Sequence, residues 1–212
     1  MWIFVFVFFS KKQNGFKSCG DNFMCKKLEE LSRLKIEDLY DLFDDEFASP
    51  PVNVHRILDL LGVEYNAVDF RQLKGDVNGI TLPDQAEMVM GAVAARSIAE
   101  HGKDSVEITV NVHDNYHRQR FTLAHELAHC MLHADSLKHG RLELRTSVTT
   151  EEPREREANV LAGEILIPEK LLKIACAKLP IPILEILADC FDVSENVMAA
   201  RLDYLQMGYY KL

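Results

Sequence analysis

One short motif constrains this chain more than any other feature. It is the stretch His125-Glu126-Leu127-Ala128-His129, inside an apolar run that contains no Gly or Pro. On a helix, residues four positions apart share one face, with about 5–6 Å between their Cβ atoms. Two imidazoles at that spacing can bind one zinc ion, whose bonds to histidine nitrogen are about 2.0–2.1 Å long. The motif therefore predicts a helix that presents His125 and His129 to a metal.

Glu126 follows the first histidine directly, so its side chain emerges about 100° round the helix, at the edge of the metal-facing side. A carboxylate at that place lies beside the metal, where a general base acts. A bound metal lowers the pKa of water, and such a base can take the proton. We therefore predict His125 and His129 as metal ligands and Glu126 as the catalytic base.

The same pattern can arise by chance in a helix whose exposed face carries two histidines. The flanking apolar residues are Phe121, Leu123, Ala124, Leu127, Ala128, Met131 and Leu132. They predict a largely buried helix, and a buried imidazole needs a partner because an unpaired polar group in a core is costly. The metal site is therefore the better interpretation.

A second stretch, residues 153–168, supplies carboxylates for a third ligand. Glu155 shares a helical face with Ala158 and Ala162, whose small side chains would let this helix approach the motif helix closely. A carboxylate at Glu155 would complete three protein ligands and leave one position for water, as a catalytic zinc site requires. Alternatively, Glu155 and Glu157 form a solvated first turn that the helix dipole stabilises. That reading suits Glu157 better, and an exchange of the two roles remains open.

Other polar side chains near the motif receive more general roles. Asn159 could hydrogen-bond a ligand histidine and fix its tautomer. His133 continues the histidine series but is rotated by about 80°, so we expect a place behind the ligands or at the surface. His113, Tyr116 and His117 could stabilise an oxyanion, a role that depends on geometry.

Composition limits the class of protein. The chain has 212 residues, 48% hydrophobic and 27% charged, which is typical of one folded domain with small appendages. The formal net charge of −9 argues against a DNA-binding surface spread over the protein. The five cysteines form no Cys-x-x-Cys pair, which indicates reduced thiols in a cytoplasmic protein.

The first nine residues are strongly apolar but too few to cross a bilayer. No positive charge precedes them and no A-x-A-like cleavage site follows, so a signal peptide is not indicated. We expect residues 1–25 to be a disordered or non-native extension, with Met24 as the true start. An N-terminus that contacts a membrane is the alternative.

The segment before the motif predicts helices and strands. Residues 26–50 have helical spacing and acidic side chains, which indicate one or two amphipathic helices. Asn53 and Gly62 can cap the two ends of the next helix, and residues 63–70 alternate like a strand. Residues 75–83 have the composition of a turn-rich link.

Two stretches nearer the motif are candidate strands. Residues 88–95 fit a strand or a helix. Residues 106–112 alternate cleanly and predict a half-buried strand. Such a strand could pair with an extended peptide beside the active site, or it could be an ordinary internal strand.

After the motif, residues 134–153 have the character of a long loop. Beyond the helix that carries Glu155, three more helices are expected, the last with Ser194 as its cap. Their expected ranges are 169–178, 183–191 and 195–206.

Several stretches in this order resemble the ImmA/IrrE family of metallo-endopeptidases. They are Arg-Phe-Thr-Leu-Ala-His-Glu-Leu-Ala-His at 120–129, Glu-x-x-Ala-Asn at 155–159, Ile-Leu-Ile-Pro at 165–168 and Leu-Ala-Asp-Cys-Phe-Asp-Val-Ser at 187–194. The opening Pro51-Val52-Asn53-Val54 and Leu61-Gly62-Val63 also fit, so the likeness covers about residues 51–207. Ala128 stands where the family commonly has Gly. The resemblance implies that His125, His129 and Glu155 bind Zn²⁺ and that Glu126 is the catalytic base.

The resemblance also implies a fold and a division of the chain. The fold is α+β, a zincin-like metallopeptidase core with a small β-sheet packed on the motif helix, plus a C-terminal helical bundle. We expect the extension at 1–25, a helical N-terminal segment at 26–50, a zincin-like peptidase domain at 51–178 and a C-terminal helical segment at 179–212.

The activity implied is that of a gluzincin-like zinc metalloprotease, a hydrolase. The implied substrate is a helix-turn-helix transcriptional repressor, whose cleavage would release the genes of a phage, another mobile element or a stress response. Many relatives carry a DNA-binding domain at the N-terminus, but residues 1–50 are too short and acidic to supply one. We therefore expect no direct contact with nucleic acid and no stable membrane span. The alternative is a non-catalytic binding module or toxin–antitoxin component, with a structural zinc closed by four protein ligands.

Overall fold

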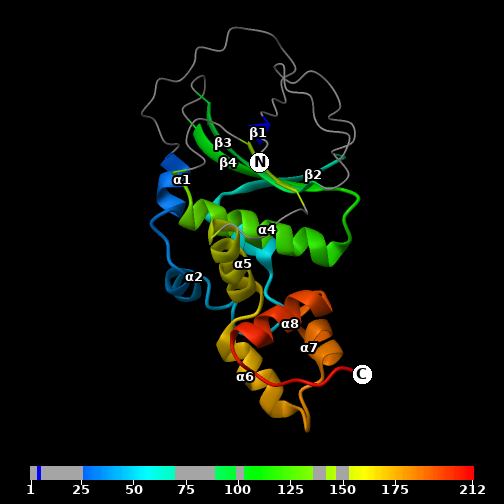
Figure 1. Cartoon of the computed structure of the whole chain (residues 1–212). Helices are drawn as coiled ribbons and strands as arrows, with labels where there is room; N and C mark the ends of the chain where they lie inside the picture. The colour runs from blue at the N-terminus through cyan, green and yellow to red at the C-terminus, as the bar shows by residue number, and fades with distance from the viewer. Residues whose placement is uncertain (1–3, 6–25, 70–88, 99–102, 136–141, 147–152) are drawn as a thin grey trace.

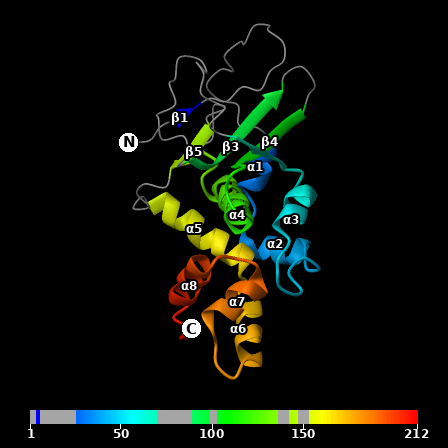
Figure 2. The same cartoon turned by 90° about the vertical axis from the view of Figure 1, so that its right-hand side faces the viewer.

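The structure of the chain is a computed structural model that describes residues 4–5, 26–69, 89–98, 103–135, 142–146 and 153–212. This part of the chain combines eight α-helices with one five-stranded sheet, so it has the α+β class that the sequence predicts. Figures 1 and 2 show the sheet at one end of the molecule and the last three helices at the other. The expected link at 75–83 lies outside the described residues.

The sheet has the strand order β1-β5-β3-β4-β2. Neighbouring strands pair antiparallel, except that β2 and β4 run parallel. The long antiparallel pairing of β3 with β4 places Val93 opposite Ile108 and forms the middle of the sheet. The strands are β1 (Phe4–Val5), β2 (Glu64–Val68), β3 (Val89–Ile98), β4 (Lys103–Asn111) and β5 (Leu142–Thr146).

The strands predicted at 63–70 and 106–112 are present as β2 and β4, and the ambiguous stretch at 88–95 belongs to β3. Of the two alternatives for residues 106–112, the structure supports the ordinary internal strand, because β3 and β2 occupy both edges of β4 and leave no edge for a peptide. The strand is also more than half-buried. Glu107 on its polar face is buried and accepts a hydrogen bond from the Asn66 amide at 2.6 Å.

The expectation of a loop throughout residues 134–153 is also wrong. Residues 142–146 form β5, which pairs with β3 on one side and with β1 on the other. Leu142-Glu143-Leu144-Arg145 alternates apolar and polar side chains, which is a strand signal that the prediction of a loop overlooked. Phe4 and Val5 of β1 are the only described residues of segment 1–25, and the prediction of an extension there stays a prediction.

Three helices precede β2 in the described chain. The acidic segment 26–50 contains α1 (Lys26–Leu31) and α2 (Ile36–Leu42), as its spacing predicts. Helix α3 (Val54–Leu61) begins at Asn53, whose side chain accepts a hydrogen bond from the backbone N–H of Arg56 at 3.1 Å. It ends at Gly62, which has a φ of 67° and supplies the left-handed turn that favours glycine. Both predicted caps are confirmed.

Helix α4 (Tyr116–Leu132) carries the motif and lies against one face of the sheet (Figures 1 and 2). Its N-cap is Asn115, whose side chain accepts a hydrogen bond from the backbone N–H of Arg118 at 2.9 Å. Every residue from 122 to 131 is buried, because α1, α3, α5 and the strands β3 and β4 contact this helix. The predicted burial of the motif helix is therefore confirmed.

The last four helices follow the predicted order. Helix α5 (Pro153–Leu166) packs across α4, and α6 (Glu169–Lys178), α7 (Leu184–Phe191) and α8 (Glu195–Tyr204) lie beyond it (Figure 2). Ser194 caps α8 as predicted, and its hydroxyl accepts a hydrogen bond from the N–H of Val197 at 3.3 Å. The helix ends before the expected Gln206, which has a left-handed φ of 56°. None of the described helices meets the length and hydropathy that a membrane span requires.

A buried arginine on α4 links the C-terminal helices to the rest of the molecule by hydrogen bonds and an ion pair. The Arg120 guanidinium donates hydrogen bonds to the carbonyls of Val52 at 2.6 Å and Phe191 at 3.3 Å. It also forms an ion pair with the Asp192 carboxylate at 2.8 Å. The N-terminal side of α3, the end of α7 and the motif helix therefore meet at one side chain.

Candidate metal centre

Helices α4 and α5 bring three of the sequence-predicted side chains together. The Nε2 atoms of His125 and His129 lie 2.9 Å apart. The carboxylate of Glu155 lies 3.3 Å from Nε2 of His125 and 3.2 Å from Nε2 of His129. One ligand atom from each residue falls within 4.8 Å of the others, so this three-donor set could hold a metal ion.

The positions of the three donors follow from helix geometry. The two histidines are four residues apart near the middle of α4, on one face. Glu155 lies in the first turn of α5. Ala158 and Ala162 on the same helix are fully buried, and such small side chains allow two helix axes to come close. The close packing of α5 on α4 therefore carries the carboxylate to the histidines.

The surroundings set the charge of the carboxylate. His125 and His129 are buried, and the side chain of Glu155 is 16% exposed. Burial alone raises the pKa of Glu155, but hydrogen bonds and charge from the two histidines outweigh it and hold that pKa well below its usual range. Glu155 is therefore ionised at neutral pH, which is the form of a carboxylate that binds metals.

Glu126 lies on α4 directly after His125 and is buried. It does not belong to the three-donor set. The catalytic role itself stays a prediction.

Comparison with known families gives a match over residues 87–203, more than half of the chain. The matching family is the peptidase M78 family, described as the IrrE N-terminal-like domain. The chain belongs to this family. The resemblance drawn from the motifs is therefore confirmed. A separate search of curated proteins finds no match.

Membership of the peptidase M78 family indicates a peptidase, and a peptidase acts on a protein substrate. Together with the three-donor set, it suggests a metallopeptidase. All three donors and Glu126 fall within the matched residues.

Two further polar residues of this peptidase lie next to the set. Nδ1 of His133 is 3.1 Å from Nδ1 of His129, and Nε2 of His133 is 2.9 Å from the Glu157 carboxylate. The contact of Glu157 is thus with His133, so the geometry gives no support to an exchange of roles between Glu155 and Glu157. The sequence leaves two places open for His133, behind the ligands or at the surface, and nothing local in it indicates that Glu157 is the partner.

The residues considered for an oxyanion role have contacts elsewhere. Nε2 of His113 lies 3.1 Å from the Asp69 carboxylate, and Nε2 of His117 lies 3.1 Å from the Asp192 carboxylate. Tyr116 is exposed. These contacts give the oxyanion role no support. The expected hydrogen bond from Asn159 to a ligand histidine stays a prediction.

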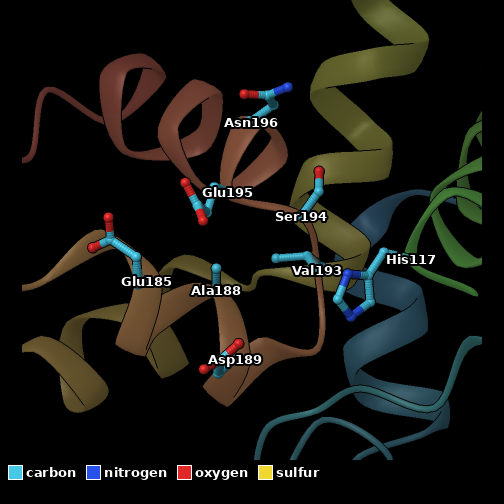
Figure 3. Close-up of a pocket in the computed structure, with 8 residues that line it drawn as sticks. All are labelled: His117, Glu185, Ala188, Asp189, Val193, Ser194, Glu195 and Asn196. Atoms are coloured by element: carbon cyan, nitrogen blue, oxygen red, sulfur yellow. The ribbon is translucent and has the colours of Figure 1, made fainter. Parts of the chain in front are cut away.

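A hollow of about 380 Å³ lies between the first turn of α4 and helices α7 and α8. Figure 3 shows His117 at one side of it and the carboxylates of Glu185, Asp189 and Glu195 around it. None of the four residues predicted for metal binding or catalysis lines this hollow. It is therefore separate from the three-donor set.

Proposed function

We propose that this chain is a zinc-dependent endopeptidase. In this proposal His125, His129 and Glu155 bind the zinc, and Glu126 is the general base. The observation that carries the proposal is the convergence of two imidazole nitrogens and one carboxylate from two helices.

The donor set suits zinc. Two histidines and one glutamate form a ligand set of catalytic zinc peptidases, and a fourth position is then left for water or substrate. Among the described residues, the set contains three donors rather than the four that close a structural site. This number favours the catalytic reading over a binding module with a structural zinc.

When bound, zinc supplies a Lewis acid that polarises a carbonyl and lowers the pKa of a water molecule. Glu126 then accepts a proton from the attacking water and returns it to the amine that leaves. The side chain is buried beside His125, and few competing water molecules reach a carboxylate in such a place. His125, His129 and Glu155 orient the site for this transfer.

The fold and boundaries belong to the same proposal. The sheet on one side of α4 and the packing of α5 on α4 support a zincin-like core at residues 51–178. Segments 26–50 and 179–212 then add helices to it, with α6–α8 as the basis of the C-terminal bundle.

The proposed substrate is a helix-turn-helix repressor, cleaved to release genes of a mobile element or a stress response. The resemblance to the ImmA/IrrE family supports this choice. The net charge of −9 also favours a basic partner, such as the DNA-binding surface of a repressor. The free thiols of Cys176 and Cys190 support a cytoplasmic location.

The test uses the full chain and the helix-turn-helix protein encoded beside it, with fragments identified by mass spectrometry. We expect cleavage that a chelator stops. Glu126→Gln should keep zinc but lower the rate by about 10²- to 10⁴-fold, the contribution of a general base. Glu30→Gln, at an exposed salt bridge in α1, is the matched control and should cleave normally. Undiminished cleavage by Glu126→Gln would falsify the assigned role.

A further inference from the structure

The three-donor set continues toward the surface through two more side chains. Nδ1 of His129 faces Nδ1 of His133 at 3.1 Å, and Nε2 of His133 faces the Glu157 carboxylate at 2.9 Å. His133 is 8% exposed as a residue, whereas the Glu157 side chain is 63% exposed. His129, His133 and Glu157 therefore form a continuous series of polar contacts from the buried donors to solvent.

The direction of each hydrogen bond in this series follows from the groups at its two ends, the metal-binding histidine and the carboxylate. A neutral histidine that binds a metal through Nε2 carries its proton on Nδ1. The His129 Nδ1–H then needs an acceptor, and Nδ1 of His133 supplies one only when the His133 proton sits on Nε2. That Nε2–H in turn donates to Glu157, because an ionised carboxylate can only accept. The two neutral imidazoles and the carboxylate are therefore mutually consistent.

We propose that His133 and Glu157 are positioning residues that hold His129 in the tautomer and orientation that zinc requires. This inference rests on the proposed function, because it concerns the same metal. Partners behind metal-bound histidines commonly change metal affinity by about 10- to 100-fold when they are removed.

A different role for His133 follows from its place in α4. It is the C-cap residue, and its backbone N–H donates to the His129 carbonyl at 2.8 Å. A side chain at a helix C-terminus can stabilise the helix through the macrodipole without any effect on a metal. The test must therefore separate zinc affinity from helix stability.

Two substitutions of similar shape make this separation. His133→Asn keeps an acceptor oxygen close to the former Nδ1, whereas His133→Leu has nearly the same volume and no acceptor. Zinc affinity is measured for the full chain by competition with a chromophoric chelator. The visible spectrum of bound Co²⁺ reports the coordination, and thermal unfolding of the metal-free proteins reports stability.

We expect His133→Leu to bind zinc about 10- to 100-fold more weakly than the wild-type chain. His133→Asn should recover most of that loss and keep a Co²⁺ spectrum close to wild type. Glu157→Leu should lose less affinity than His133→Leu, because water can replace an exposed carboxylate as acceptor. Glu157→Gln, which keeps an acceptor oxygen, should lose least.

The outcomes separate this inference from the proposed function. If the wild-type chain binds no zinc at the three donors, the proposed function fails and the inference fails with it. If the wild-type chain binds zinc and both His133 variants bind it equally well, only the inference is overturned. Equal losses in Asn and Leu variants would also overturn it, because packing rather than an acceptor would then explain the effect.

Discussion

Oε1 of Glu155 lies 3.2 Å from Nε2 of His129, in a contact between the first turn of α5 and the last turn of α4. A metal held by these two side chains would cross-link the two helices. Binding of the metal is then coupled to packing of α5 on α4, because the three donors meet only when the two helices are packed together.

This coupling predicts a large effect of zinc on stability. A ligand that binds only the folded state stabilises it by about 4 kcal/mol when its free concentration is 1,000 times Kd. For a chain of this size, 1 kcal/mol shifts Tm by about 2–4 °C, so we expect zinc to raise Tm by about 8–16 °C. Differential scanning calorimetry in buffered zinc, with and without a chelator, measures the shift.

Glu155→Ala provides the decisive comparison for that shift. The variant removes one of the three donors and should lose most of the zinc-dependent rise in Tm. Glu30→Ala, which removes an exposed carboxylate of α1, should keep it. A full shift in Glu155→Ala would show that zinc stabilises the chain at another place.

The close approach of α5 to α4 depends on small side chains. A larger side chain there should therefore weaken the packing of the two helices. Ala162 is fully buried on α5. Ala162→Leu should lower the free energy of unfolding by about 1–3 kcal/mol, because a packed interior resists added volume. It should also weaken zinc binding by moving Glu155 away from the histidines. Urea unfolding and chelator competition measure the two effects.

Ala200→Leu is the matched control for this substitution. Ala200 is exposed on α8, so a larger side chain meets solvent there and should change stability by less than about 0.5 kcal/mol. If Ala162→Leu were as stable as Ala200→Leu, close packing at Ala162 would not be what positions α5.

The features that the sequence predicted best depend on neighbours along the chain. Asn53 and Ser194 each accept a hydrogen bond from the backbone three residues later, and Gly62 supplies a left-handed turn. The ligand pair on α4 has the same local origin, since helical spacing alone puts two histidines on one face.

The features that the sequence missed depend on distant partners. The pairing of strand β5 with β3 and β1 involves residues far along the chain, although the alternation of Leu142, Glu143, Leu144 and Arg145 is a local signal of a strand. The sequence left open whether β4 has a free edge, and only the parallel pairing of β2 beside it decides that it has none. The contact of His133 with Glu157 likewise requires α5 to cross α4, so only the tertiary structure reveals it.

We expect a large loss of stability when Arg120, which lies outside the metal site, is replaced. Its buried guanidinium bonds to Val52 and Phe191 and pairs with Asp192. Arg120→Ala leaves the carbonyls of the buried residues Val52 and Phe191 without this donor, and an unsatisfied buried acceptor costs about 1–3 kcal/mol. Urea unfolding should show a loss of this size.

Arg33→Ala is the control for Arg120, because Arg33 is exposed and pairs with the exposed side chain of Glu29 in α1. An exposed pair contributes about 0–1 kcal/mol, so the loss should be small. Similar losses in the two variants would contradict the role of Arg120 as a tie between the C-terminal helices and the rest of the molecule.

The surroundings of Tyr40 predict that the stability of the protein falls at alkaline pH. Its hydroxyl donates to the carboxylate of Glu164, which forms an ion pair with the buried Arg201. Burial of the phenol raises the pKa of Tyr40 from 10.0 to about 12, against the opposing charge of Arg201. The unfolded chain therefore loses this proton before the folded chain does, and the free energy of unfolding falls as pH rises from about 10 to about 12. Below pH 10 the contribution is complete.

Tyr40→Phe removes both the hydrogen bond and the titration. At pH 7 we expect the variant to be less stable by about 1–2 kcal/mol, since a hydrogen bond to a charged group is lost at a partly buried site. Other groups also titrate above pH 10, so the measured quantity is the wild-type curve minus the variant curve, from urea unfolding between pH 8 and 12. That difference should shrink as pH rises through the window. The exposed Tyr210→Phe should give a difference near zero at every pH, and a Tyr40→Phe difference that stays constant would show that burial does not hold the Tyr40 proton.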